Sequence, residues 1–220
     1  MTLRGDFHMH THFSFDCVTP PEALMKRCQD VGLTCIAVTD HNSIRGAQAL
    51  RAIAPFMVIL GEEIKSTAGE ITGLFIQEEI EPGLSPVETA KRIKEQGGLV
   101  SIPHPFTGMG RSSLARGPLM EILAYVDIVE GFNARTMETR LNEEGREFAR
   151  EHGLAVTAVS DSHTLTELGH TFTELPEFDG TPEAFKEALR EASYTKRPAP
   201  KLVHLYSTFS KLRRKLFPPR

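Results

Sequence analysis

The sequence predicts an α/β protein folded as a barrel of parallel strands, and three observations support this. Short apolar runs alternate with amphipathic stretches along most of its 220 residues. Two of these stretches begin with Ser85-Pro86 and Thr181-Pro182, where a capping hydroxyl precedes proline at the first helical position. Unusual polar residues follow the apolar runs, at the strand ends that converge on one face of a parallel barrel. Residues remote in sequence are therefore expected to meet at that face.

Six apolar runs and six amphipathic stretches have the pattern of strands and helices. The expected strands span residues 3–8, 33–40, 56–63, 99–104, 126–132 and 154–161. The expected helices span residues 21–31, 43–54, 85–96, 112–125, 136–152 and 181–192. Residues 63–76 predict an extended hairpin that turns at Gly69-Glu70. This hairpin is expected to lie beside the polar strand ends.

Length and composition limit the class of protein. A chain of 220 residues with 40% hydrophobic and 25% charged side chains suits one globular domain and excludes wholesale disorder. No apolar run reaches the roughly 18 residues of a membrane-spanning helix, and the first residues turn polar too early for a secretory signal. Cys17, Cys28 and Cys35 show no metal-type pairing, which favours a reducing compartment. A cytoplasmic protein is expected.

The charge is divided between an acidic body and a basic end. Residues 192–220 hold eight Lys or Arg and no Asp or Glu, which leaves 17 basic and 29 acidic side chains, a formal charge of −12, in residues 1–191. The acidic body disfavours broad coating by nucleic acid. We expect a barrel domain at residues 1–195 and a basic extension at residues 196–220. The extension is expected to dock on the barrel, with contact to RNA, a membrane surface or another chain as alternatives.

The polar residues after the strands are of the types that bind metal ions. His8 and His10 are two residues apart on an extended segment, so both imidazoles project to one face. Six more candidate ligands follow along the chain: Asp16, His41, Glu63, His104, Asp161 and His163. Imidazole and carboxylate ligands without thiolate suit Zn, Mn or Fe. Because eight ligands are too many for one ion, and a carboxylate such as Glu63 bridges two, the sequence predicts a polynuclear site.

The order of these motifs resembles that of the PHP (polymerase and histidinol phosphatase) superfamily. The matching motifs are His8-Met9-His10, Thr39-Asp40-His41-Asn42, Gly61-Glu62-Glu63-Ile64, His104-Pro105 and Ser160-Asp161-Ser162-His163. They cover roughly residues 5–170. The resemblance implies a distorted seven-stranded (β/α) barrel, with the metal site at the carboxyl ends of the strands. It also implies a phosphoesterase with two to three divalent ions, usually Mn, Zn or Fe.

The resemblance further implies how the ligands are shared among the ions. The first ion would be held by His8, His10, Glu63 and Asp161. Another would be held by Asp16, His41 and His163, and a third by Glu63 and His104. Many relatives carry histidine in the hairpin where this chain has Thr72. Either Glu70 or water replaces that ligand, or the third ion binds weakly.

Cationic and imidazole side chains near the same face are candidates for binding the substrate. Arg111, Arg116 and Arg135 follow strand ends, and a guanidinium suits bidentate recognition of phosphate. Each is also explained as a solvated loop charge, although Arg135 stands in an Asn-x-Arg pattern that resembles one in PHP relatives. His12 is expected as a loop residue or substrate contact, and His170 as a phosphate contact or acid. The predicted catalytic residues are Asp161, His163, Arg135 and His170.

The predicted reaction is hydrolysis of a phosphomonoester, or of the terminal ester of a nucleotide or short oligonucleotide, by metal-activated water. No protein nucleophile is required. Hydrolysis of a C–N or C–O bond by the same metals is the first alternative, and a non-catalytic module that binds a nucleotide or a protein is the second. Release of phosphate distinguishes the predicted reaction from both alternatives.

Overall fold

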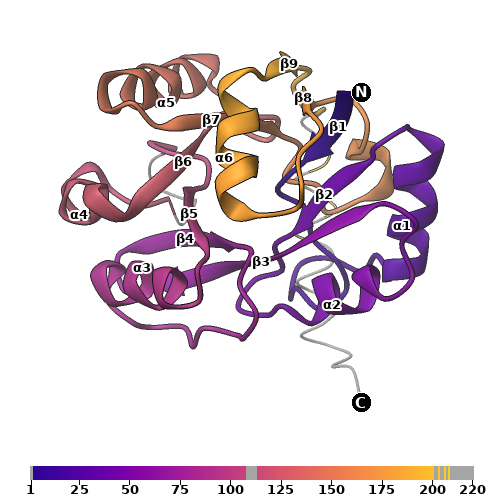
Figure 1. Cartoon of the computed structure of the whole chain (residues 1–220), viewed down its shortest axis with the longest axis horizontal. Helices are drawn as coiled ribbons and strands as arrows, with labels where there is room; N and C mark the ends of the chain where they lie inside the picture. The colour runs from indigo at the N-terminus through magenta and orange to yellow at the C-terminus, as the bar shows by residue number, and fades with distance from the viewer. Residues whose placement is uncertain (1, 108–112, 201–202, 204–205, 207, 209–220) are drawn as a thin grey trace.

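A sheet of nine strands, curled into a nearly closed barrel, forms the centre of the computed structural model (Figure 1). The structure describes residues 2–107, 113–200, 203, 206 and 208. In the order in which neighbours pair, the strands are β7 (Ala155–Val159), β6 (Val126–Asn133), β5 (Leu99–Ile102), β4 (Gly69–Leu74), β3 (Met57–Ser66), β2 (Cys35–Val38), β1 (Thr2–Asp6), β8 (Phe172–Pro176) and β9 (Ser193–Thr195). Most neighbours in this order are also consecutive in sequence.

The sheet mixes parallel and antiparallel pairs. β1, β2 and β3 pair in parallel, as do β5, β6 and β7. β4 joins the two groups by antiparallel pairing to β3 and β5, while β8 pairs antiparallel with β1 and β9 with β8. The expected number of seven strands is wrong, since the described residues form nine. The difference arises because β8 and β9 continue the sheet from the free edge of β1.

Six α-helices connect the strands within the described residues. They are α1 (Pro21–Asp30), α2 (Arg45–Arg51), α3 (Pro86–Glu95), α4 (Arg116–Ile122), α5 (Thr139–His152) and α6 (Pro182–Arg190). Two 3₁₀ helices, η1 (Leu123–Tyr125) and η2 (Leu165–Glu167), complete the helical elements. Figure 1 shows α1 and α2 against the part of the sheet that contains β2 and β3, and α3, α4 and α5 on the side of β4 to β7.

The predicted helix starts are confirmed at α3 and α6. Ser85 Oγ accepts a hydrogen bond from the backbone N–H of Glu88 at 3.2 Å, and Thr181 Oγ1 accepts one from Ala184 at 3.3 Å. Proline occupies the first turn of each helix, where its missing N–H costs nothing. These local contacts are determined by neighbouring residues, so the sequence is sufficient to locate them.

Alternating side chains of β2 build two separate cores. Cys35 and Ala37 point into the barrel and pack in a cluster that includes Phe7. Ile36 and Val38 point outward and pack in the cluster under α1 and α2. A strand buried on both faces needs apolar residues at every position, which accounts for the unbroken apolar run of β2.

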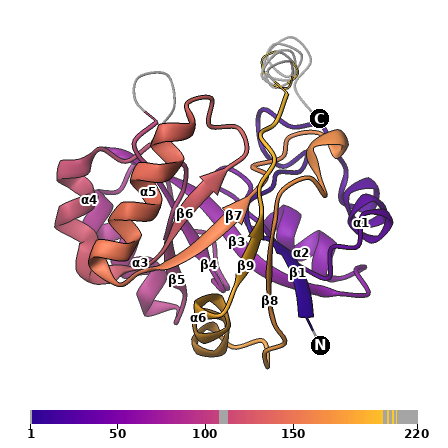
Figure 2. The ribbon, with the colours of Figure 1, turned by 90° about the horizontal axis from the view of Figure 1, so that it is seen from above.

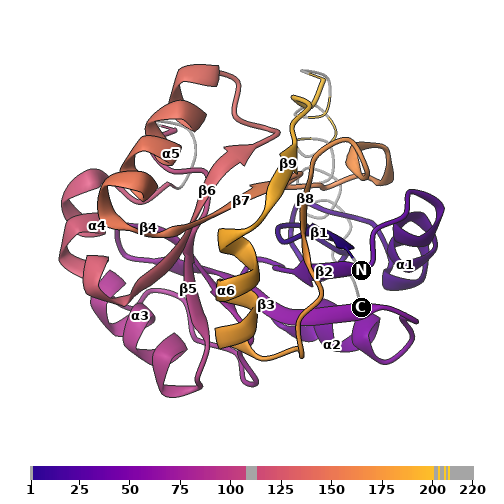
Figure 3. The ribbon, with the colours of Figure 1, turned by 45° about the horizontal axis from the view of Figure 1, so that its top comes forward.

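Helix α6 covers one end of the barrel (Figures 2 and 3). Its Phe185 is fully buried and packs edge-on against Phe7 with ring centroids 4.8 Å apart. Phe75 and Phe178 also lie against Phe185, at 5.4 and 5.3 Å. This apolar plug fills the end where the parallel strands begin. The end where they finish is left for polar side chains.

Side chains hold together the seam where the barrel does not close by a backbone ladder. Thr173 Oγ1 on β8 accepts a hydrogen bond from the backbone N–H of Ala158 on β7 at 2.9 Å and donates to its carbonyl at 3.0 Å. The Tyr194 hydroxyl on β9 donates to the carbonyl of Val156 at 3.2 Å. The seam thus satisfies backbone groups that an open sheet edge would leave unpaired.

The six expected strands correspond to β1, β2, β3, β5, β6 and β7, and the hairpin is formed by β3 and β4. Its turn lies at residues 67–68, two positions before the expected Gly69-Glu70. The ladder already pairs Ser66 with Gly69, and Ser66 Oγ donates to the Gly69 carbonyl at 2.5 Å. Strands β8 and β9 were not expected from the sequence. Both are short, and the three residues of β9 lie near the surface.

Three remaining expectations concern the chain as a whole. Among the described residues, no helix has the length and apolar character needed to cross a membrane. Cys17, Cys28 and Cys35 are all buried as free thiols, and burial raises the pKa of Cys28 and of Cys35 to about 12. Most of the basic extension at residues 196–220 lies outside the described residues, so its docking stays a prediction.

Candidate metal centre

The eight predicted ligands are brought together at the carboxyl ends of the parallel strands. His8 and His10 follow β1, His41 follows β2, and Glu63 lies within β3. His104 follows β5, and the Asp161-x-His163 pair follows β7. Asp16 lies in the loop between β1 and α1. Backbone contacts such as the hydrogen bond from His10 N to the Ser162 carbonyl, 2.9 Å, tie these loops to one another.

Four donor atoms converge on a first position. His8 Nε2 lies 3.1 Å from His10 Nε2, and Glu63 Oε2 lies 3.4 and 3.6 Å from these nitrogens. Asp161 Oδ1 lies 3.7 Å from His8 Nε2 and 3.5 Å from His10 Nε2. Two ligands of one ion, with bonds of about 2.0–2.2 Å, lie about 2.8–3.6 Å apart. The observed separations are close to this range, so the four groups could hold one cation.

Hydrogen bonds behind the imidazoles determine which nitrogens face this position. His8 Nδ1 donates to Glu130 Oε1 at 2.6 Å, because a carboxylate only accepts. Ser14 Oγ donates to Asp40 Oδ1 at 2.8 Å and therefore accepts from His10 Nδ1 at 2.9 Å. In the neutral imidazoles both Nε2 atoms then present lone pairs to each other. Lone pairs and carboxylate oxygens that converge without a proton between them fit a divalent cation.

Burial and the surrounding charges shift the pKa values of both histidines at this first position. Burial lowers the pKa of His8, but the nearby carboxylates of Glu130, Glu63 and Asp161 outweigh it and raise that pKa well above its usual value. Burial and the positive imidazoles around it lower the pKa of His10 to about 3. The negative potential that favours a proton on His8 also favours a metal ion beside it.

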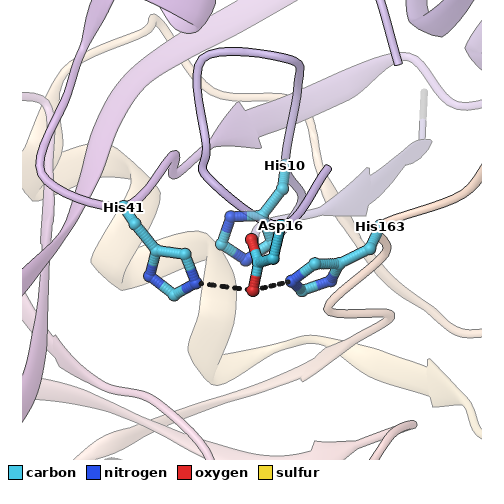
Figure 4. A group of neighbouring side chains, drawn as sticks. All are labelled: His10, Asp16, His41 and His163. Carbon is cyan, nitrogen blue, oxygen red and sulfur yellow. Dashed lines mark ion pairs between the residues drawn. The ribbon is translucent and has the colours of Figure 1, made fainter. Parts of the chain in front are cut away.

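A second group surrounds Asp16 (Figure 4). Asp16 Oδ2 lies 3.4 Å from His41 Nε2 and 3.2 Å from His163 Nε2. The ring of His10 stands next to both, and one donor atom from each of the four residues lies within 4.8 Å of the others. Burial opposes ionisation of Asp16, but the imidazoles of His163 and His41, which hydrogen-bond to it, hold the pKa of its carboxyl well below the usual value. An ionised carboxylate among imidazoles is a typical donor set for Zn, Mn or Fe.

The carboxylate of Glu63 faces four of the predicted imidazole ligands. Its Oε2 faces His8, His10 and also His41 Nδ1, which lies 3.0 Å away. Its Oε1 faces His104 Nε2 at 2.9 Å. Glu70 Oε2 approaches the same nitrogen of His104 at 3.7 Å. The carboxylate of Glu63 is therefore placed to bridge neighbouring cation positions.

Two of the predicted ligands have unusual backbone conformations. His104 and Asp161 have φ angles of 29° and 53°, in a region that residues other than glycine adopt at a cost of about 1–3 kcal/mol. Each residue lies two positions after the end of a parallel strand, His104 after β5 and Asp161 after β7. Both side chains are buried among the predicted ligands.

Glu130 was not predicted from the sequence to take part in the site. This buried carboxylate on β6 accepts from His8 Nδ1 through Oε1, and from the backbone N–H of His104 and Asn133 Nδ2 through Oε2, at 2.7 and 2.8 Å. The signal in the sequence was Glu130 itself, one of two acidic residues, with Asp127, inside the apolar run 126–132. Such a residue is costly to bury unless it accepts hydrogen bonds.

The arginines predicted to bind substrate lie in different surroundings. Arg135 is buried, and its guanidinium contacts His163 Nδ1 at 2.6 Å, Glu167 Oε1 at 3.1 Å and the Val203 carbonyl at 3.1 Å. Arg116 is exposed and forms an ion pair with Glu144 at 3.0 Å. Arg111 lies outside the described residues. Their roles in binding or catalysis stay predictions.

The two predicted loop histidines lie outside the ligand groups. His12 is half-buried and stacks on Phe13 with ring centroids 4.4 Å apart. His170 is exposed and lines a cavity of about 330 Å³ together with Glu167 and residues 197–200. A role in substrate binding stays a prediction for both.

Comparison with known proteins places the chain in a family. The PHP domain model matches residues 6–107, and the PHP-associated model matches residues 139–194. The protein MJ0417 of Methanocaldococcus jannaschii, itself uncharacterized, is 33% identical over 180 residues, which cover 80% of this chain and 72% of that protein. The chain belongs to the PHP family.

Solved structures share the fold at low sequence identity. A two-domain protein of Bacteroides vulgatus, which contains a predicted PHP-like metal-dependent phosphoesterase, superposes with a TM-score of 0.72 at 18% identity, over 96% of this chain and 70% of that one. Endonuclease Q, in complex with a 27-mer duplex with an abasic lesion at the active site, gives 0.64 at 17%, over 87% and 57%. An amidohydrolase of Chromobacterium violaceum gives 0.64 at 16%, over 89% and 98%. These similarities concern the fold.

Proposed function

We propose that the protein is a metal-dependent phosphoesterase that hydrolyses phosphomonoesters or the terminal phosphoester bonds of nucleotides and short oligonucleotides. The observation that carries the proposal is the buried carboxylate of Glu63, against which donor groups from β1, β2 and β5 converge. Two to three divalent ions, of Mn, Zn or Fe, fit these donor groups. Membership of the PHP family and the phosphoesterase neighbour of the same fold also support it.

Bound metal ions would supply an activated water and neutralise charge on the phosphoryl oxygens. The residues of the chain hold that centre in place. Asp161 Oδ1 lies between the first and second groups, 3.5 Å from both His10 Nε2 and His163 Nδ1. Asn133 Nδ2 donates to Asp161 Oδ2 at 3.3 Å and thereby fixes its orientation. The guanidinium of Arg135 donates a hydrogen bond to His163 Nδ1 at 2.6 Å, so we propose that Arg135 positions this imidazole.

An exposed aromatic ring beside the centre supports a substrate with an aromatic part. Phe15 is 49% exposed and stacks on His41 with ring centroids 4.8 Å apart. A base stacks favourably on such a ring, by about 1–3 kcal/mol. Endonuclease Q, which shares the fold, was solved with a DNA substrate. Nucleotides and short oligonucleotides are therefore the first substrates to test, with His12, His170, Arg111 and Arg116 as proposed contacts.

Hydrolysis of a C–N or C–O bond is the second candidate. The same donor groups would activate water for attack on a carbonyl carbon, and the amidohydrolase of Chromobacterium violaceum has this fold. A panel that contains amides and lactones beside phosphate esters separates the two candidates.

The test is phosphate release from phosphomonoesters, nucleotides and short oligonucleotides, with Mn-loaded protein compared with the chelated protein. We expect metal-dependent release, and we expect Asp161→Asn and His8→Ala to lower the rate at least about a hundredfold, because loss of even an outer partner of a metal site costs roughly 10–100-fold. Asp30→Asn, at an exposed carboxylate at the end of α1, is the matched control and should leave the rate unchanged. Full turnover by both site variants with normal metal content would refute the proposal. Silence of folded, metal-loaded protein across the panel favours the C–N hydrolase or a non-catalytic binding module.

A further inference from the structure

Strand β4 brings two polar side chains to the rim of the centre. The antiparallel ladder pairs Glu63 with Thr72 and Lys65 with Glu70. Directly paired residues point to the same face of a sheet, as do residues two apart. Glu70 and Thr72 therefore share the face from which Glu63 reaches its imidazole partners. Both are buried, although their residue types are polar.

Thr72 places a buried hydroxyl group beside Glu63. Its side chain is 2% exposed, and its Oγ1 has no hydrogen-bond partner among the described residues. Thr72 is the direct partner of Glu63 in the ladder, but its hydroxyl ends one bond beyond Cβ. A buried polar atom without a partner costs about 1–3 kcal/mol. A bound ion or water molecule beside Thr72 Oγ1 would remove this cost.

Glu70 reaches the same region with a longer side chain. Its Oε2 lies 3.7 Å from His104 Nε2, and His104 Nε2 lies 2.9 Å from Glu63 Oε1. One donor atom each of His41, Glu63 and Glu70 lie within 4.8 Å of one another. Two buried carboxylates this close repel each other unless a cation lies between them.

We propose that Glu70 is a ligand of a third cation, bound between Glu63, Glu70 and His104, and that this oxygen-rich position selects Mn²⁺ or Mg²⁺ over Zn²⁺. The inference rests on the proposed function only in assuming that the centre binds metal. The first two groups present two or three imidazoles each, whereas the third presents two carboxylates and one imidazole. Carboxylate and water ligands suit Mg and Mn, while imidazole suits Zn and Fe.

The test counts metal ions in the holoprotein. Protein loaded with Mn²⁺ is equilibrated at a series of free Mn²⁺ concentrations, and Mn bound per chain is measured by mass spectrometry of the elements. Glu70→Gln keeps the shape of the side chain but removes its charge. We expect this variant to bind one Mn fewer per chain than the wild type, with affinity at the weakest position lowered at least tenfold. Glu78→Gln, at an exposed carboxylate after β4, should bind as many ions as the wild type.

A second variant tests selectivity by adding a nitrogen donor. Thr72→His places an imidazole beside Glu63, and we expect Zn²⁺ to displace Mn²⁺ from the weakest position at a concentration at least tenfold lower than in the wild type. An unchanged count in Glu70→Gln together with unchanged competition in Thr72→His would overturn the assignment of Glu70. Wild-type protein that binds no metal at all would overturn the proposed function as well, so the two failures are distinguishable.

Discussion

Glu130 shows how a single residue controls several others. Both of its carboxylate oxygens accept hydrogen bonds, from His8, from the backbone of His104 and from Asn133. All of these partners are donors, and the two carboxylate oxygens accept from all three. Fixing His8 Nδ1 as a donor leaves Nε2 free to bind a cation. The position of one buried charge thereby determines the chemistry of its neighbours.

We predict that Glu130→Gln lowers the affinity for Mn²⁺ by about 10–100-fold, because the amide nitrogen of glutamine would face His8 Nδ1, or the two donors at Oε2, and cannot accept a hydrogen bond from any of them. The unfolding free energy of the metal-free protein should fall by about 1–3 kcal/mol. Calorimetric titration with Mn²⁺ measures the first effect, and urea unfolding measures the second. Glu121→Gln, at an exposed glutamate of α4, is the control. Wild-type affinity in Glu130→Gln would show that His8 does not depend on this carboxylate.

Helix α2 is positioned by the contacts of its glycine. A Cβ at Gly46 would collide with Asp40 Oδ2 and Thr11 Oγ1. Asp40 accepts hydrogen bonds from Thr11 N and Oγ1, both at 2.6 Å, and from Ser14 at 2.8 Å. Ser14 in turn holds His10. Close approach of α2 to this network therefore connects a helix on the outside of the barrel to the candidate metal centre.

We predict that Gly46→Ala destabilises the protein by about 1–3 kcal/mol, because the added methyl forces the Asp40 network apart. This exceeds the gain of about 0.5–1 kcal/mol that alanine brings to a helix. Gly117→Ala in α4 is the matched control. Apart from its chain neighbours and the backbone of its own helix, no described atom lies within 4 Å of the new Cβ. That control should be neutral or stabilised. Urea unfolding of both variants measures the difference, and equal stabilities would contradict the packing argument.

The molecule as a whole is built with an apolar end and a charged end. Phe185 and its neighbours fill one end of the barrel, while Asp16, Glu63, Glu70 and Asp161 gather at the other. Four buried carboxylates at one end of a barrel repel one another. Their repulsion weakens the fold unless imidazoles and cations balance it.

We predict that metal removal lowers the midpoint of thermal unfolding. A ligand that binds only the folded state at 100 times its dissociation constant contributes about 2.7 kcal/mol, or about 5–10 °C for a chain of this size. The midpoint should therefore rise with Mn²⁺ concentration and fall with a chelator, as followed by circular dichroism. In Glu63→Gln the rise should be much smaller. A wild-type midpoint that is the same in chelator and in excess Mn²⁺ would contradict a metal site linked to the fold.

Local features were predictable from the sequence because neighbouring residues decide them. The caps of Ser85 and Thr181, the apolar run of β2 and the identity of the predicted ligands depend on residue type and spacing. Predicted ligands follow the parallel strands β1, β2 and β7, so the expectation of parallel strands was enough to gather His8, His41 and Asp161 in one place. The sequence by itself therefore determined the α/β class and the gathering of the predicted ligands at one end of the barrel.

Only the tertiary structure decided the distances between the predicted ligands and the identity of the residues that hydrogen-bond to them. Strands β8 and β9 exist because β1 offers a free edge, which no local pattern reveals. The role of Glu130 follows from its contacts with residues 26 and 122 positions away, and that of Glu70 from the ladder between β3 and β4. Contacts between remote residues depend on register and packing of the whole sheet, and these are set by free energies summed over the molecule rather than by any short stretch of chain.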